Sequence, residues 1–256
     1  MASLSEIVEF CDSELRIAEI PDYPQALNGL QLANRSGEVT RIVAAVDACL
    51  PVIRESVVRQ GNLLVVHHGM FWSGAQRIVD AQFEKIRVAM EGDLAIYSCH
   101  IPLDVHPGLG NNAMLMKSLE LSAEINPFFD WKGIQLGLRA DGVGVNRDEL
   151  LERVKSATGA DALICPGGPE KIESLGVITG GAGGEVLAVG ETGIDTFITG
   201  EGPHWSYTAA EELGMNVIYA GHYATETFGV KSLAGELCDR LEGELSWEFV
   251  DHPTGL

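Results

Sequence analysis

Two adjacent histidines, His67 and His68, end an apolar run in the stretch NLLVVHHGMFW, which begins at Asn62. The short leucine- and valine-rich run before them is typical of a buried strand. Neighbouring side chains of a regular strand point to opposite faces of the sheet. The two imidazoles can therefore share one site only at the strand terminus, where Gly69 lets the chain turn. Otherwise each serves a different ion of a pair.

Ionisable residues also follow four other predicted strands. They are Asp47 at the end of 39–47, His100 and Asp104 after 94–98, Glu201 and His204 after 195–199, and His222 and Glu226 after 216–220. Ligands of open α/β sheets bind outside the carboxyl ends of the strands. We therefore expect these side chains to converge on one crevice, although they lie far apart in the sequence.

The last predicted helix provides a test of this convergence. Its apolar stripe runs through Val230, Leu233 and Leu237, and the same spacing continued backward reaches Glu226 and His222. Residues four apart share one face of a helix. If the helix begins near His222, both side chains point into the crevice, whereas a start at residue 225 makes the spacing only approximate.

The predicted ligands combine imidazole nitrogens with carboxylate oxygens and include no sulfur. They are His67, His68, Asp104, His222 and Glu226. This donor set suits zinc, manganese, iron or nickel better than copper(I) or calcium. Five ligands exceed the needs of one tetrahedral zinc, and a carboxylate can bridge two ions about 3.5–4 Å apart. We predict two divalent metal ions per chain.

Three further residues, His100, Glu201 and His204, are predicted to move protons during catalysis. Each has a simpler alternative: His100 can orient a ligand rather than act directly, Glu201 can cap a helix, and His204 can be structural. Asp47 can likewise serve only as the acidic start of the following helix. Phe71, Trp72 and Trp131 can stack a flat ligand or belong to a core or a subunit contact.

The sequence gives no support to phosphate-loop, serine-hydrolase or cysteine-based sites. The segment GGAGGEVLAVG, from Gly180, lacks the spacing of a phosphate-binding loop and is interpreted as a flexible turn. No G-x-S-x-G motif is present, which gives serine hydrolysis no support. The five cysteines form no C-x-x-C pair, so a thiolate zinc site and a disulfide framework are both disfavoured.

The elements that must position these residues alternate between helix and strand. Helices are predicted over 4–18, 51–61, 79–91, 111–121, 147–158, 204–213 and 224–242, with strands over the ranges given above and over 62–66. This alternation favours an α/β fold with mostly parallel pairing. The amino-acid composition becomes rich in aromatic residues and glycine after about residue 127. We therefore predict a metal-binding α/β lobe from 1–126 and 195–256, with 127–194 as a smaller inserted α/β element.

Charge and hydropathy exclude several classes of partner. The net charge of −20 disfavours binding to nucleic acid and to anionic membranes, because phosphates are repelled. No apolar run reaches the roughly 18 residues of a membrane helix, and the acidic N-terminal segment does not match a signal peptide. These features predict a cytoplasmic protein with a small-molecule substrate or a metal as its ligand.

Four motifs occur in an order that resembles the type 2 GTP cyclohydrolase I homologue family, also called NIF-three-like proteins. They are NGLQ at 28–31, HHG at 67–69, HIPLD at 100–104 and GHYATE at 221–226. The resemblance covers about residues 4–250. It implies a two-lobed α/β protein with mixed, mostly parallel sheets flanked by helices, assembled as a toroidal homohexamer. It also implies a dinuclear metal site, facing an internal cavity, on His67, His68, Asp104, His222 and Glu226.

Two functions follow from these features. The first is a metal-dependent hydrolase of the GTP cyclohydrolase type, in which the ions activate water for attack on an electrophilic carbon or phosphorus. The second is a non-enzymatic metal-binding scaffold that serves regulation or metal delivery. A surplus of ligands at one sheet edge favours the enzyme, because five protein ligands on two ions leave coordination positions open.

Overall fold

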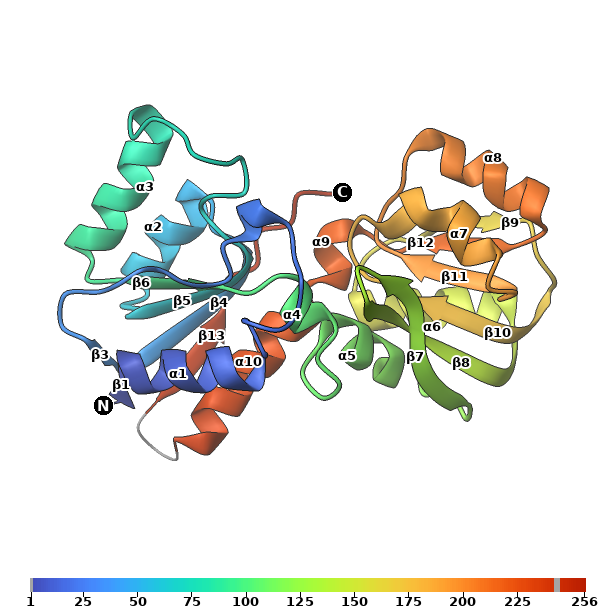
Figure 1. Cartoon of the computed structure of the whole chain (residues 1–256), viewed down its shortest axis with the longest axis horizontal. Coiled ribbons are helices and arrows are strands. Elements are labelled where there is room, and N and C mark those ends of the chain that lie inside the picture. Colours follow the sequence, from blue (N-terminus) through green and yellow to red (C-terminus); the bar gives the residue numbers. More distant parts are fainter. Residues whose placement is uncertain (1, 242–244) are drawn as a thin grey trace. The chain divides into compact units, whose positions relative to one another are not determined.

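The computed structural model describes residues 2–241 and 245–256, and the chain divides into two compact units (Figure 1). The first unit comprises Met1–Leu103 and Gly229–His252, and the second comprises Asp104–Phe228 and Pro253–Leu256. Each unit has its own sheet.

The first unit is built on a five-stranded sheet in the order β13-β4-β5-β6-β2. Its strands are β2 (Gly29–Leu32), β4 (Arg41–Asp47), β5 (Leu63–His68), β6 (Ala95–Ser98) and β13 (Ser246–Phe249). All neighbours pair in parallel except β2, which runs antiparallel to β6. β4, β5 and β6 are buried on both faces, which explains why their sequences are continuously apolar rather than alternating. A short antiparallel pair, β1 (Ala2–Ser3) and β3 (Glu38–Val39), lies beside the first helix.

Helices cover both faces of this sheet (Figure 1). They are α1 (Leu4–Glu14), α2 (Leu50–Val58), α3 (Asp80–Glu91) and α10 (Thr227–Arg240), whose first two residues belong to the second unit. α2 and α3 lie on one face, where Ile53 and Ala89 pack against Val43, Leu64 and Ile96. α1 and α10 lie on the other face.

The second unit is built on a six-stranded sheet in the order β7-β8-β10-β11-β12-β9. Its strands are β7 (Glu124–Trp131), β8 (Ile134–Asn146), β9 (Leu163–Pro166), β10 (Lys171–Val177), β11 (Thr196–Thr199) and β12 (Asn216–Tyr219). β10, β11 and β12 are parallel to one another, whereas β7–β8, β8–β10 and β9–β12 are antiparallel pairs.

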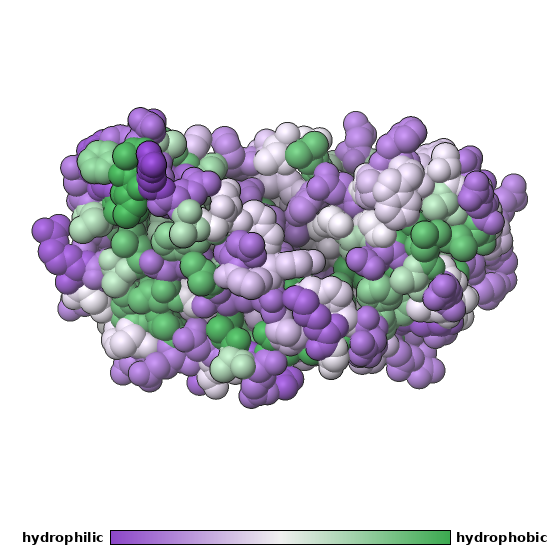
Figure 2. Space-filling model, turned by 45° about the horizontal axis from the view of Figure 1, so that its top comes forward, coloured by the Kyte–Doolittle hydropathy of each residue, from purple (hydrophilic) through white to green (hydrophobic). Residues whose placement is uncertain are grey.

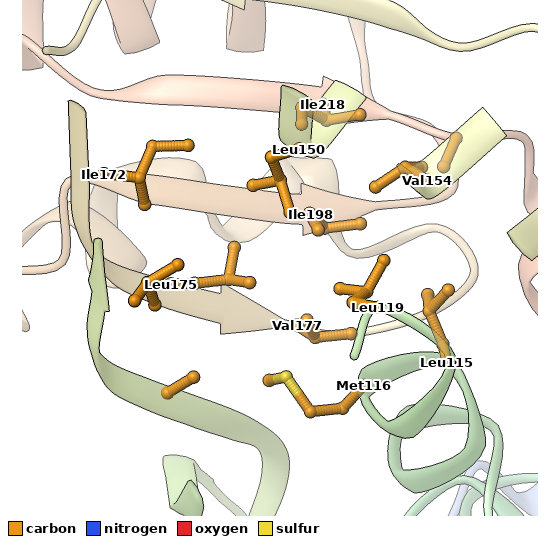
Figure 3. Packing of buried hydrophobic residues seen from close by; sticks show 13 residues of the cluster. Leu115, Met116, Leu119, Leu150, Val154, Ile172, Leu175, Val177, Ile198 and Ile218 are labelled. Carbon is orange, nitrogen blue, oxygen red and sulfur yellow. The ribbon is translucent and has the colours of Figure 1, made fainter. Parts of the chain in front are cut away.

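The core of the second unit lies between its sheet and two helices (Figure 3). α5 (Asn111–Ser118) supplies Leu115 and Met116, and α6 (Arg147–Thr158) supplies Leu150 and Val154. The opposite face is covered by α7 (Val186–Gly190), which follows the 3₁₀ turn η2 (Ala182–Glu185), and by α8 (His204–Leu213). Hydrophilic side chains cover much of the surface shown in Figure 2, in keeping with the net charge of −20.

The α/β class with mixed sheets is confirmed, but the division of the chain differs from the predicted one. β11 and β12 were expected in the first lobe, yet they pair with β10 and β9 in the sheet of the second unit. Residues 104–126 also belong to the second unit rather than to the first. The five strand ends that bear ionisable residues therefore belong to two sheets and not to one edge, because a strand's apolar pattern does not identify its pairing partner.

Several elements match the predictions closely. α6 and α8 have the predicted bounds, and Gly159 closes α6 in a left-handed conformation (φ 68°). The last predicted helix is divided, since α9 (His222–Thr225) precedes α10 and Glu226 lies between them with φ −105°. Residue 242, its predicted last residue, lies outside the described residues. Among the residues that the structure describes, no helix combines the length and the apolar composition needed to cross a membrane.

Candidate metal centre

Three imidazoles gather where β5 and β6 end in the first unit. His67 and His68 are the last two residues of β5, and His100 follows β6. Their ring centroids lie 4.9 Å apart for His67 and His68, 4.8 Å for His67 and His100, and 5.5 Å for His68 and His100. One ring nitrogen from each lies within 4.8 Å of the others. The rings are thus close enough for a shared cation, as expected for a strand terminus.

Each of these rings is oriented through its Nδ1 atom. The distances are 3.0 Å from His67 Nδ1 to the carbonyl oxygen of Cys99, 2.9 Å from His68 Nδ1 to Asp47 Oδ1, and 2.9 Å from His100 Nδ1 to Asp22 Oδ1. Carbonyl and carboxylate oxygens accept hydrogen bonds, so Nδ1 carries the proton and, in the neutral ring, Nε2 carries the lone pair. A hydrogen bond of this kind also makes the other nitrogen a better metal ligand.

Asp22 joins the first loop of the chain to His100. Its Oδ2 accepts hydrogen bonds from Asn28 Nδ2 (2.8 Å) and from the backbone N–H of Ile101 (2.9 Å), and Asn28 Oδ1 accepts one from the backbone N–H of His100 (2.8 Å). Burial raises the pKa of Asp22, but the hydrogen bonds from His100, Asn28 and the Tyr23 backbone, with the charge of His100, outweigh it and lower the pKa. Asp22 therefore stays ionised beside His100. Asp22 was not among the residues predicted from the sequence, where its only signal is its position shortly before the NGLQ motif.

Gly69 is required by close packing at the point where the chain leaves β5. Gln31 of the NGLQ motif donates from Nε2 to the carbonyl oxygens of Ala26 (3.0 Å) and Leu27 (3.1 Å), while its Oε1 accepts from the backbone N–H of Met70 (2.8 Å). A Cβ atom at Gly69 would overlap the Gln31 amide group. This close contact anchors the chain directly after the histidine pair, and a turn over residues 70–73 follows it.

The second unit contributes a histidine and a buried glutamate at the ends of α9. His222 Nε2 lies 3.2 Å from Glu226 Oε1, and His222 Nδ1 lies 2.8 Å from Glu201 Oε1. The Glu226 side chain is only 3% exposed, whereas that of Glu201 is 42% exposed. The two side chains meet as their four-residue spacing predicted, although Glu226 lies just beyond the end of α9. Glu201, predicted to move protons, accepts a hydrogen bond from His222 in the same way that Asp47 does from His68.

The glycine-rich segment after β10 makes room for the Glu226 carboxylate. Gly180 has a φ of +70°, and a Cβ atom there would overlap Glu226 Oε1. Its backbone N–H donates to Thr225 Oγ1 at 3.0 Å, which ties this segment to α9. The first two residues of the segment interpreted from the sequence as a flexible turn therefore pack beside His222 and Glu226, and the rest of the segment forms η2 and α7.

Asp104, another predicted ligand, contacts the residue just before the same segment. It ends α4 (Ile101–Asp104) and is buried. Its Oδ1 accepts hydrogen bonds from Asn111 Nδ2 (2.8 Å) and from Thr179 Oγ1 (3.3 Å). Thr179 directly precedes Gly180, so that Asp104 and Glu226 both contact one two-residue stretch of the second unit. The two carboxylates predicted as metal ligands therefore both belong to this unit.

His204 is placed differently from the other predicted residues. It is exposed and begins α8, directly after Pro203. Among the described residues it belongs to neither group of potential metal ligands. Its predicted role in proton transfer therefore stays a prediction.

The two carboxylates around His222 raise its pKa. Burial lowers this pKa, but the hydrogen bonds and negative charges of Glu226 and Glu201 together outweigh burial and raise it to about 9. Without a cation, His222 is therefore an imidazolium at neutral pH and forms an ion pair with Glu226. A cation that binds His222 must displace this proton.

Metal binding at neutral pH is accordingly expected to release a proton from His222. Titration calorimetry with Zn²⁺ or Mn²⁺ at pH 7.5, in buffers of different ionisation enthalpy, measures the number of protons released per bound ion. Because the pKa in the folded, cation-free protein lies near 9, metal affinity should rise from pH 7 to 9 and level off above it. His222→Gln should remove this pH dependence. Equal heats in all buffers for the wild-type protein would contradict the assignment.

The carboxylates behind the histidines are expected to tune metal affinity without binding the cation themselves. Asp47→Ala should weaken metal binding by about 10- to 100-fold, because His68 loses the acceptor that fixes its tautomer. Asp47→Asn should have a smaller effect, since an amide oxygen still accepts the hydrogen bond. Asp239→Asn, at an exposed position of the same unit, is the matched control. Equal affinity in Asp47→Ala and the wild type, measured by competition with a chelator, would exclude this role.

The whole chain is similar to a family of known proteins. Residues 2–254 match the model of the Duf34/NIF3 (NGG1p interacting factor 3) family. A protein from Deinococcus radiodurans, named GTP cyclohydrolase 1 type 2 homolog, is 38% identical over 98% of this chain and 94% of its own length. A Pyrococcus abyssi protein of the same name is 36% identical over 98% of both chains.

The fold is shared as well. A crystal structure of a Thermus thermophilus protein aligns with a TM-score of 0.90 and 35% identity, covering all of both chains. The structure of HcgD from Methanocaldococcus jannaschii, in its reduced form, aligns with a TM-score of 0.84 at 24% identity over 98% of both chains. At this lower identity the second likeness indicates a common fold only.

Proposed function

The chain belongs to the Duf34/NIF3 family, and we propose that it binds two divalent cations per chain and uses them to hydrolyse a small molecule. The observation that carries the proposal is the shared orientation of four histidines. His67, His68, His100 and His222 each direct Nδ1 to an oxygen acceptor. In each neutral ring, Nε2 is then the nitrogen that can bind a cation or, at His100, accept a proton.

The donor set fits a pair of borderline divalent cations. Imidazole nitrogen and carboxylate oxygen, without thiolate, suit zinc, manganese, iron and nickel. The first unit offers mainly imidazoles, whereas the second offers the buried carboxylates Asp104 and Glu226. We propose His67, His68, Asp104, His222 and Glu226 as the ligands, because two dications need carboxylates to neutralise them.

The cations, when bound, would lower the pKa of water toward neutrality and stabilise negative charge on the reacting group. The protein's own contribution is to hold protons at defined atoms. His100 donates from Nδ1 to the ionised Asp22, so its Nε2 can accept a proton while Asp22 stabilises the imidazolium. Glu201 fixes the tautomer of His222. Glu201 and His204 are the other two residues proposed to transfer protons.

Hydrolysis of the GTP type is the reaction to test first, since relatives at 36–38% identity are named GTP cyclohydrolase 1 type 2 homolog. The metal-loaded protein should be incubated with GTP, a cyclic amide and a phosphodiester, and product formation followed. We expect turnover of one of them, its loss with a chelator, and a large loss in His100→Gln at unchanged metal content. Full metal occupancy with no turnover of any of the three would reject the hydrolase.

The second candidate is a metal-binding scaffold for regulation or metal delivery. The His222–Glu226 ion pair favours it, because this pair compensates the buried carboxylate when the cation is absent and so lowers the cost of metal release. Rapid transfer of the cation to a chelator near pH 6, without any hydrolysis, would favour the scaffold. Slow transfer at all pH values would favour the hydrolase.

A further inference from the structure

Two aromatic side chains form a corner beside the histidines of the first unit. Tyr23 precedes the 3₁₀ turn η1 (Pro24–Ala26), and Trp72 lies in the turn after β5. Their ring centroids are 6.3 Å apart with an angle of 78° between the ring planes. Trp72 also meets the ring of His100 at 4.6 Å and 65°, and that of His68 at 5.2 Å and 45°. We define Tyr23 and Trp72 as the aromatic corner.

The aromatic corner is half exposed although its backbone is well anchored. Trp72 is 39% exposed and Tyr23 is 47% exposed. The backbone N–H of Tyr23 donates to Asp22 Oδ1, the same oxygen that His100 contacts. Next to Trp72, Phe71 packs against the core under α2 and α3. The rings are therefore held at the histidines by their neighbours, while much of their own surface stays open to solvent.

Stacking suits this part of the molecule better than ion pairing does. The groups around the histidines are carboxylates, and the whole chain carries a charge of −20. A planar, uncharged ring is not repelled by these charges, and it can lie against the face of one aromatic residue while it meets the edge of the other. The near-perpendicular angle between Tyr23 and Trp72 supplies one face and one edge.

We propose that the aromatic corner binds the flat, uncharged heteroaromatic ring of the substrate, of the size of a purine base, with Trp72 as the main stacking partner. This proposal rests on the proposed hydrolase site, since it places the ring beside His100. It makes Tyr23 and Trp72 residues that determine specificity, and it assigns neither of them a role in metal binding.

The test is calorimetric binding of guanosine, which carries the ring but no phosphate, to the metal-loaded protein. Trp72→Leu should weaken binding by about 5- to 150-fold, the range expected for loss of one base–aromatic stack. Trp72→Phe should retain most of the affinity because it keeps an aromatic face. Trp205→Leu, at a half-exposed tryptophan of the second unit, is the matched control and should bind like the wild type. Ribose should not bind.

Metal content and thermal midpoint, measured on the same samples, should be unchanged in Trp72→Leu. Equal guanosine affinity in Trp72→Leu and the wild type would overturn the proposal, as would absence of guanosine binding to the wild type. A general shielding role for Trp72 would instead appear as loss of metal in Trp72→Leu, and it would also overturn the proposal. Guanosine binding that depends on Trp72, in a protein that hydrolyses nothing, would support the aromatic corner and reject only the hydrolase.

Discussion

Replacing Asp104 with asparagine is expected to remove most of the bound metal while the fold survives. Asp104 is 7% exposed, and its Oδ1 accepts hydrogen bonds from Asn111 and Thr179. An amide oxygen can still accept both bonds, so the packing around residue 104 is retained. The negative charge and the anionic ligand are lost. We therefore expect metal affinity to fall by more than roughly 100-fold, the upper range for loss of a residue that only hydrogen-bonds to a ligand.

This expectation must be measured against the metal-free protein. A cation that binds only the folded state stabilises it, and loss of metal therefore lowers the unfolding midpoint even when the fold is intact. After chelation, Asp104→Asn and the wild type should differ by no more than about 1 kcal/mol in unfolding free energy. Asp130→Asn, at an exposed carboxylate of β7, is the matched control. A stability loss in metal-free Asp104→Asn with unchanged metal content would show that Asp104 is structural.

Gly200→Ala is expected to damage both the fold of the second unit and its part of the metal centre. A Cβ atom at Gly200 would lie 2.7 Å from the carbonyl oxygen of Gly180, 2.7 Å from the Cα of His222 and 2.8 Å from Thr225 Oγ1. Two of these contacts are with backbone that cannot rotate away. Overpacking of this kind costs about 1–3 kcal/mol and shifts the backbone, which moves His222 away from Glu226.

Urea unfolding of the metal-free protein measures the first effect, and metal affinity measures the second. Gly184→Ala is the matched control, because a Cβ atom at Gly184 meets nothing within 4 Å. We expect Gly184→Ala to match the wild type in both measurements. Wild-type stability in Gly200→Ala would mean that β11 and α9 are not packed as described.

Local patterns made several parts of this protein predictable from its sequence. The predicted bounds of α6 and α8 agree with the structure, and Gly159 closes α6 as a helix-ending glycine is expected to do. The spacing of His222 and Glu226 predicted that they share a helix face, and their 3.2 Å contact agrees. The run before His67 predicted a buried strand, and β5 is fully buried up to His67.

Long-range pairing was not predictable in the same way. Nothing in the short runs at 196–199 and 216–219 indicates that they join the second sheet, because buried strands of both sheets are equally apolar. Asp22 contacts His100 across 78 residues of sequence, and an aspartate in a loop has no pattern that reveals such a partner. Gly180 looked like part of a flexible turn, since close packing against Glu226 depends on coordinates rather than on composition.

The metal content of the purified full-length protein tests the central claim most directly. Elemental analysis should find two divalent ions per chain in the wild type. It should find fewer than two in His68→Gln and fewer than two in Glu226→Gln, because each variant loses one proposed ligand. A wild-type protein without metal would contradict the account, and so would two ions retained by either variant.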